Sequence, residues 1–105
     1  MSFRWPNKDP DEVLDYSVDW SRFLAGATIL DVQWYVDDAS GVKTEIVPGA
    51  VVNGIQNVAE NIIGDVATIN LGLGTNNTEY KFTCRIESST GNIVERVIRL
   101  RVKEQ

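Results

Sequence analysis

The sequence contains no histidine and a single cysteine, Cys84. Histidine is the commonest general base and transition-metal ligand, so its absence removes Cys-His pairs, Ser-His-Asp triads and ordinary zinc sites. A lone cysteine cannot form an internal disulfide, so the core must hold the fold, as in a reducing cytoplasm. We therefore expect no enzyme, and we assign no catalytic, cofactor-binding or metal-binding residues.

Long apolar runs are also missing. A membrane-spanning helix needs about 20 consecutive apolar residues, and the longest run here is far shorter. The first six residues carry no apolar stretch of the kind that a signal peptide has. With 105 residues, 43% hydrophobic and 24% charged, the composition predicts one compact, soluble domain that is not exported by the usual route.

Basic residues are scarce until the end of the chain, and the net charge is -5. Residues 1–40 carry eight acids against three bases, whereas residues 81–105 carry three acids against six bases. An acidic protein repels phosphate backbones. We expect neither nucleic acid nor a membrane as a partner.

What is present is alternation of apolar and polar residues, the period of half-buried strands. It predicts strands over residues 14–20, 30–36, 42–47, 67–71, 80–86 and 94–102, and the last two form a hairpin. Residues 50–63 fit neither period, and a short helix there stays an alternative. About seven short strands predict an all-β, immunoglobulin-like sandwich over residues 13–105, preceded by an arm over residues 1–12.

The candidate core consists of four residues that share inward parity. We expect their strands to pack across the sandwich from each other, with Trp34 as the central aromatic and Tyr80 as the corner tyrosine. Cys84 in such a place is protonated and inert. The four residues are Trp34, Tyr80, Phe82 and Cys84.

Two charged segments have a structural and a functional interpretation. The run Asp9-Pro10-Asp11-Glu12 fits a capping box for one helical turn. The alternative is a calcium site completed by Asp15, but the loop lacks the glycine and distal glutamate of an EF-hand, and we favour the turn. On the last strand, outward Arg99, Arg101 and Lys103 predict pairing with the first strand, through Asp15 and Asp19.

The arm begins with two aromatics and an arginine, in the run Phe3, Arg4, Trp5 and Pro6. Chain ends are normally polar and mobile. Trp5 either folds over this domain's own core or docks on a neighbouring molecule, since Trp and Arg dominate interface hot spots. Both alternatives stay open, and all four residues are candidates for an interface.

The chain resembles small Ig-like proteins of tailed bacteriophages and prophages, described as hypothetical phage proteins or fibre-tail adaptors. Two blocks carry the resemblance, and the first is the more distinctive. It reads Trp5-Pro6-x-Lys8-Asp9-Pro10-Asp11-Glu12-x-x-Asp15-Tyr16-x-x-Asp19-Trp20-x-x-x-Leu24, followed by Thr28-Ile29 and Trp34. The second reads Ala67-Thr68-Ile69-x-Leu71-x-x-Gly74-Thr75-x-x-Thr78-x-Tyr80 and continues through Ile86, Gly91 and Arg96 to Val102.

This resemblance implies a non-enzymatic structural protein of the virion, made in the host cytoplasm, that joins tail or neck to fibres. The implied partners are other phage structural proteins and further copies of the chain in a ring-like homo-oligomer. The alternative is an Ig-like binding module for a host-surface glycan or protein. Such a module needs exposed aromatics on loops, where the sequence offers only Tyr35, near a strand end.

Overall fold

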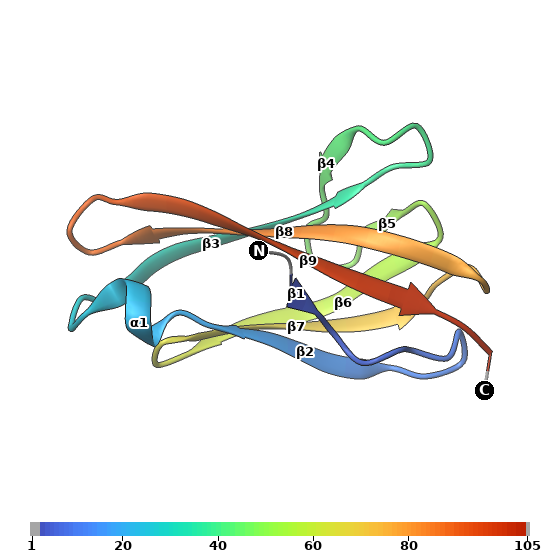
Figure 1. Cartoon of the computed structure of the whole chain (residues 1–105), viewed down its shortest axis with the longest axis horizontal. Coiled ribbons are helices and arrows are strands. Elements are labelled where there is room, and N and C mark those ends of the chain that lie inside the picture. The colour runs from blue at the N-terminus through green and yellow to red at the C-terminus, as the bar shows by residue number, and fades with distance from the viewer. Residues whose placement is uncertain (1–2, 105) are drawn as a thin grey trace.

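The protein, seen in a computed structural model that describes residues 3–104, is a sandwich of two β-sheets (Figure 1). The five-stranded sheet has the order β1 (Phe3–Arg4), β9 (Ile93–Val102), β8 (Thr78–Ser88), β3 (Ile29–Asp37), β4 (Lys43–Glu45). The four-stranded sheet has the order β2 (Leu14–Asp19), β7 (Val66–Leu73), β6 (Ile55–Ile63), β5 (Val51–Val52). A short helix, α1 (Ser21–Leu24), follows β2. The predicted all-β sandwich is confirmed.

The core lies between the sheets, where alternate residues of each strand point inward. Trp34, Tyr80, Phe82 and Cys84 are all buried, none more than 1% exposed. Their strands do not face each other as predicted, because β3 and β8 are neighbours in one sheet and Trp34 is paired with Cys84. The Trp5 ring contacts Trp34 and Phe82 of this cluster, and Tyr16 of β2 stacks on Trp5.

The stretch without a clear period, residues 50–63, contains the strands β5 and β6, and the alternative of a helix there is wrong. β6 pairs with β7 along its length, but the register shifts between Asn57 and Ala59. Such a bulge adds one residue and exchanges the two faces of the strand beyond it. The two halves of β6 therefore have opposite parity, and no single period fits both.

The predicted pairing of the last strand with the first is also wrong. β2 pairs antiparallel with β7, whereas β9 lies between β8 and β1, which runs parallel to it. Opposite charges across a strand pair contribute about 0.2 to 1 kcal/mol each, less than burying the inward faces of two strands. Burial of Tyr16 and Val18 against the opposite sheet decides the arrangement.

The turn at residues 9–12 and the corner role of Tyr80 were both predicted from the sequence. In the turn, Glu12 Oε1 accepts the Asp9 N–H at 2.8 Å and Asp9 Oδ1 accepts the Asp11 N–H at 2.8 Å, so these carboxylates serve the turn's own backbone. The Tyr80 hydroxyl donates to the Asn53 carbonyl at 2.8 Å and accepts the Thr75 N–H at 2.9 Å. Tyr80 thus ties two loops together, as a corner tyrosine does.

Candidate assembly surface

The N-terminal segment is built into the sandwich. Its strand β1 pairs with β9, and the Trp5 N–H donates to the Arg99 carbonyl at 2.9 Å. The Trp5 ring stacks on Tyr16 with centroids 4.9 Å apart, and its indole N–H donates to the Ser17 carbonyl at 3.1 Å. With 8% exposure, Trp5 lies in this chain's own core.

A buried lysine fastens the same segment further along. Lys8 Nζ donates to the carbonyls of Leu73 at 2.5 Å and Asp9 at 2.8 Å. The Lys8 backbone N–H also donates to the Arg101 carbonyl of β9, and the Lys8 carbonyl accepts the N–H of Lys103, just after β9. Burial lowers the pKa of Lys8, although the nearby carboxylates oppose this shift. Of the residues predicted as an arm, 1–12, the first two lie outside the described part, and residues 3–8 run along β9.

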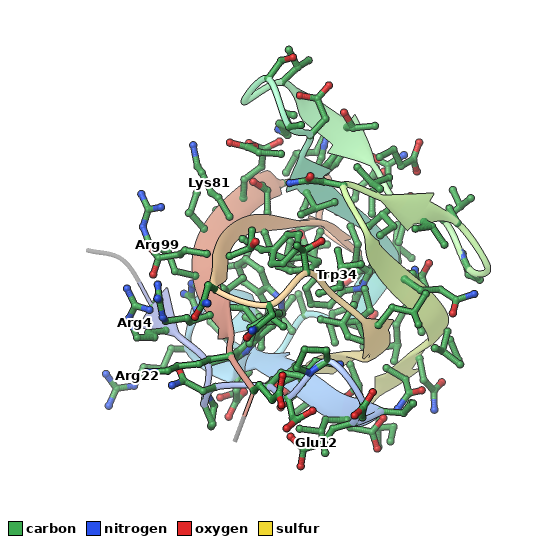
Figure 2. All side chains as sticks on the ribbon, turned by 90° about the vertical axis from the view of Figure 1, so that its right-hand side faces the viewer. Arg4, Glu12, Arg22, Trp34, Lys81 and Arg99 are labelled. Atoms are coloured by element: carbon green, nitrogen blue, oxygen red, sulfur yellow. The ribbon has the colours of Figure 1, made fainter. Side chains whose placement is uncertain are left out.

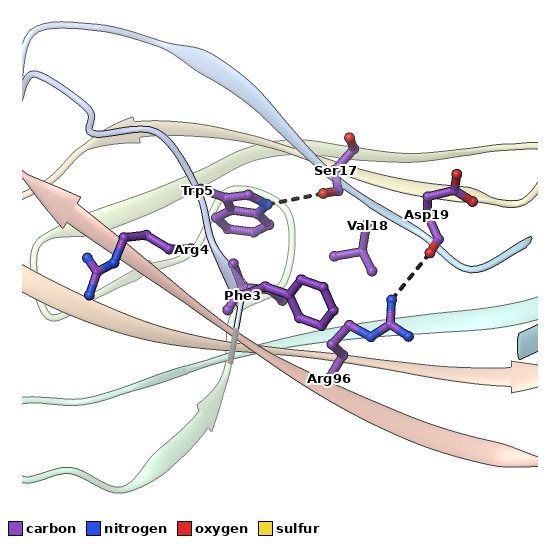
Figure 3. A pocket seen from close by; sticks show the side chains of 8 residues that line it. Phe3, Arg4, Trp5, Ser17, Val18, Asp19 and Arg96 are labelled. Carbon is purple, nitrogen blue, oxygen red and sulfur yellow. Dashed lines mark hydrogen bonds between the residues drawn. The ribbon is translucent and has the colours of Figure 1, made fainter. Parts of the chain in front are cut away.

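Beside this segment, Arg96 of β9 closes the gap between the two sheets (Figure 3). Its guanidinium carbon lies 4.8 Å from the Phe3 ring centroid and 4.6 Å from that of Trp20, a double cation-π contact. Nη1 donates to the Asp19 carbonyl at 3.3 Å. A cleft of about 210 Å³ lies here, lined by Phe3, Arg4, Trp5, Ser17, Val18, Asp19, Arg96 and Ile98.

Sequence reasoning missed Arg96 as part of this surface. It has the inward parity of Ile98 and Leu100, unlike Arg99 and Arg101. A cation on the apolar side of a strand needs an aromatic or polar partner near the rim of the core. That parity was the signal that could have marked it.

The outer side of the segment is basic and partly apolar. Phe3 is 41% exposed, and Arg4 forms an ion pair with Glu79 at 2.6 Å. Arg4 and Lys81 both lie opposite Arg99 in the strand register. Figure 2 shows Arg4, Arg99, Lys81 and Arg22 projecting from the same side of the molecule. The interface candidates therefore divide, with Phe3, Arg4 and Pro6 exposed and Trp5 buried.

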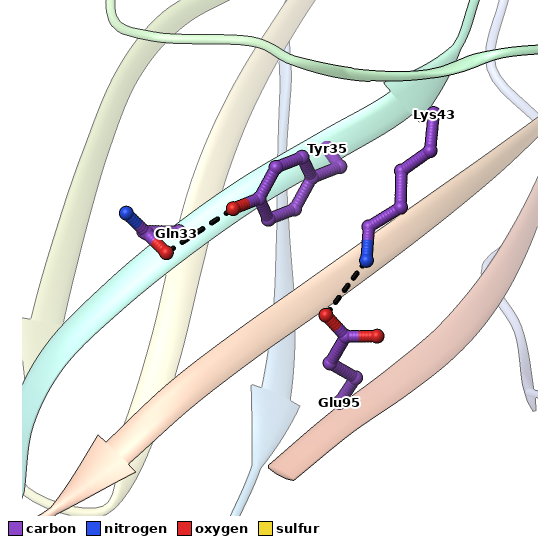
Figure 4. Close-up of polar contacts among 4 residues, drawn as sticks. All are labelled: Gln33, Tyr35, Lys43 and Glu95. Atoms are coloured by element: carbon purple, nitrogen blue, oxygen red, sulfur yellow. Dashed lines mark hydrogen bonds and ion pairs between the residues drawn. The ribbon is translucent and has the colours of Figure 1, made fainter. Parts of the chain in front are cut away.

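The other two candidate residues, Tyr35 and Cys84, have contacts that explain them structurally. Tyr35 lies on β3, where its hydroxyl donates to Gln33 Oε1 at 3.1 Å and Lys43 lies over its ring, held by Glu95 at 2.6 Å (Figure 4). It belongs to a polar network on the sheet rather than to a loop. Burial raises the pKa of the Cys84 thiol to about 12, so the thiol is protonated at neutral pH.

A model of one protein family, described as Podophage GP4 fiber-tail adaptor protein gp77, matches residues 8–101, nearly the whole chain. The chain belongs to this family. Membership makes it a component of a phage virion whose role is structural, and it implies contact with other phage structural proteins. The match starts after Phe3, Arg4 and Trp5, so the adaptor family's pattern does not include the exposed end of β1.

No curated protein matches the chain.

Within residues 3–104, no helix has the length and apolar character needed to cross a membrane.

Proposed function

We propose that this protein is a non-enzymatic adaptor that joins the fibres of a tailed phage to its tail or neck, with several copies arranged in a ring. It is made in the bacterial cytoplasm and then incorporated into the particle. Membership of the adaptor family supports the structural role. No cofactor takes part in such a function.

The observation that carries the proposal is the way the N-terminal segment is held. Trp5 and Lys8 are buried in the core. Phe3 and Arg4, which directly precede Trp5 in the sequence, are exposed. An exposed aromatic and an arginine on an anchored strand lose little conformational freedom when they bind. Phe3 and Arg4 are therefore suited to contact another virion protein.

The test uses the phage that encodes this chain, with its gene disrupted and a plasmid supplying the protein. We expect particles made without the protein to lack fibres in electron micrographs, and the wild-type chain to restore them. A chain with Phe3→Asp and Arg4→Glu should fold but be absent from purified particles. The matched control, Val42→Asp with Lys103→Glu, makes the same kinds of change at an exposed valine and an exposed lysine elsewhere and should restore fibres.

Fibres on particles that lack the protein would overturn the adaptor function. Incorporation of the Phe3→Asp, Arg4→Glu chain at the wild-type level would remove these two residues from the contact. Circular dichroism melting of each purified variant separates a lost contact from a lost fold.

A further inference from the structure

The second half of β6 has an unprotected edge. Strand β5 covers only Ile55 and Gln56. At Asn57 the carbonyl accepts the Gly49 N–H, and the N–H donates to the Ala50 carbonyl. Among residues 3–104, no strand pairs with residues 58–63 on the side away from β7. The Ile62 N–H donates instead to the Asn61 side chain, at 2.9 Å. Open edges of this kind pair readily with another chain.

This edge faces β3 across an opening on the lateral side of the sandwich. Asp31 and Val32 of β3 and Glu60, Asn61 and Ile62 of β6 line a cleft of about 280 Å³ there. Leu30 and Ile63 on the same strands are 61% and 65% exposed. The lining holds two acids and no base, and none of the strands β2, β5, β6 and β7 contains lysine or arginine. The opening is thus acidic and apolar.

The opposite lateral side has the complementary character. There Arg4, Lys81 and Arg99 lie side by side on adjacent strands, with Glu79 as the ion-pair partner of Arg4. The partly exposed ring of Phe3 lies next to them, on the other face of β1, against Arg96. In Figure 2 these basic side chains project on the side of β1 and β9, and the green ribbon of β6 lies on the other side. One chain therefore carries both halves of a matched contact, on opposite sides.

We propose that the β3–β6 opening of one copy binds the β1–β9 side of a second copy, head to tail. Two like openings would repel each other through Asp31 and Glu60, so charge favours the unlike pair. In a head-to-tail pair, one copy still has a free opening and the other still has a free β1–β9 side, so further copies can add. The chain of copies closes into a ring when the rotation between neighbouring copies divides a full turn. This inference rests on the proposed function and assigns the surfaces by which copies of the adaptor meet.

The test reverses the charges of each side in turn and follows self-association of the purified chain by sedimentation velocity at low salt. One variant carries Asp31→Lys and Glu60→Lys, and the other carries Arg4→Glu and Arg99→Glu. Each alone should raise the dissociation constant by about tenfold or more. An equimolar mixture should associate again, because the native acidic opening of the second variant meets the native basic side of the first, and the two reversed surfaces are also of opposite charge. A chain with all four substitutions should associate again.

The control variants are Asp15→Lys, on the outer face of the other edge strand, and Lys103→Glu. They make single charge reversals of the same kinds and should associate as the wild type does. A wild-type chain that stays monomeric up to about millimolar concentration would overturn the inference. So would a fourfold variant that fails to associate although its melting temperature is unchanged, or a mixture that forms no pairs.

Incorporation into particles separates this inference from the proposed function. If the chain with Asp31→Lys and Glu60→Lys enters particles at the wild-type copy number, the head-to-tail contact is wrong and the adaptor function stands. If particles without the protein carry fibres, the adaptor function fails, whatever the sedimentation result.

Discussion

On one lateral side of the sandwich the edge of β2 is covered by the side chains of Trp5 and of Arg96 on β9. On the other side, residues 58–63 at the edge of β6 have no strand beside them within the described residues, 3–104. Trp5 and Arg96 donate to the Ser17 and Asp19 carbonyls of β2. In the described part of the chain, no side chain donates to the carbonyls of residues 58–63 in this way, and Ile63 is 65% exposed. One edge is closed by side-chain bonds and aromatic packing, and the other is left available.

The comparison shows that one side of this small fold holds contacts that stabilise it, whereas the other side leaves a strand edge free to bind another chain. Proteins commonly protect an open edge with lysine or proline, and residues 58–63 contain neither. The covered side should therefore respond to substitution with large losses of stability. The open side should respond with small ones.

The largest effect is expected at Trp5. Trp5→Ala removes a ring that packs on Tyr16, Phe82 and Trp34, and it should lower the free energy of unfolding by about 3 to 5 kcal/mol. Urea unfolding followed by circular dichroism measures this, and Phe3→Ala, at an exposed neighbour, should cost about 1 kcal/mol or less. Equal losses for the two variants would place Trp5 outside the core.

Lys8 comes next, because its substitution leaves two carbonyls without their donor. Lys8→Met keeps the apolar stem and should cost about 2 kcal/mol at pH 7. The pKa of Lys8 is lowered in the folded protein, so between that pKa and 10.5 the unfolded chain binds more protons. The stability of the wild type relative to Lys8→Met should rise with pH across that interval. A flat difference between pH 8 and pH 11 would contradict the assigned burial.

A smaller loss is expected at the rim of the covered side. Arg96→Ala removes the guanidinium between Phe3 and Trp20 and should cost about 1 to 2 kcal/mol. Arg99→Ala, at an outward position of the same strand, should cost about 0.5 kcal/mol or less. Chemical denaturation of both variants side by side checks the ordering, and the reverse order would break the comparison.

The smallest effect is expected on the open side, at Glu60. Burial raises the pKa of Glu60 in the folded protein above 4.5. Between 4.5 and the raised pKa the folded state binds more protons than the unfolded chain, so stability falls as pH rises through that range. Glu60→Gln removes this dependence and should be as stable as the wild type at pH 7, or more stable by less than about 1 kcal/mol. Thermal melting at pH 4, 5, 6 and 7 tests it. A marked loss at pH 7 would show that Glu60 supports the fold.

Local pattern was sufficient for the β8–β9 hairpin, where apolar residues alternate without interruption and a turn separates the strands. It was insufficient for β6, where one additional residue exchanges the faces, and for the position of β9, which depends on the distant segment around Trp5. Strand order is a long-range property, and charge pairs on outward faces are too weak to determine it.

The candidate surface was predicted in the same uneven way. Phe3 and Arg4 stood out because aromatic and basic residues are unusual near a chain end, and both are exposed. Trp5 was selected for the same reason, but it is buried. Only the fold shows that Tyr16 and Ser17 lie beneath its ring. The open edge of β6 could not be predicted, because an edge is defined by the strands that are absent beside it.

The docking of β1 on β9 has a consequence for the order in which the protein folds. Phe3 pairs with Ile98, which the ribosome adds more than 90 residues later. Trp5 and Lys8 emerge first but acquire their partners on β9 last, so during synthesis the edge of β2 stays open and the Trp5 ring stays in water. Contacts of such long sequence separation slow folding and leave aggregation-prone intermediates. The edge of β2 is therefore open in the nascent chain until β9 is in place, and it is covered in the finished protein.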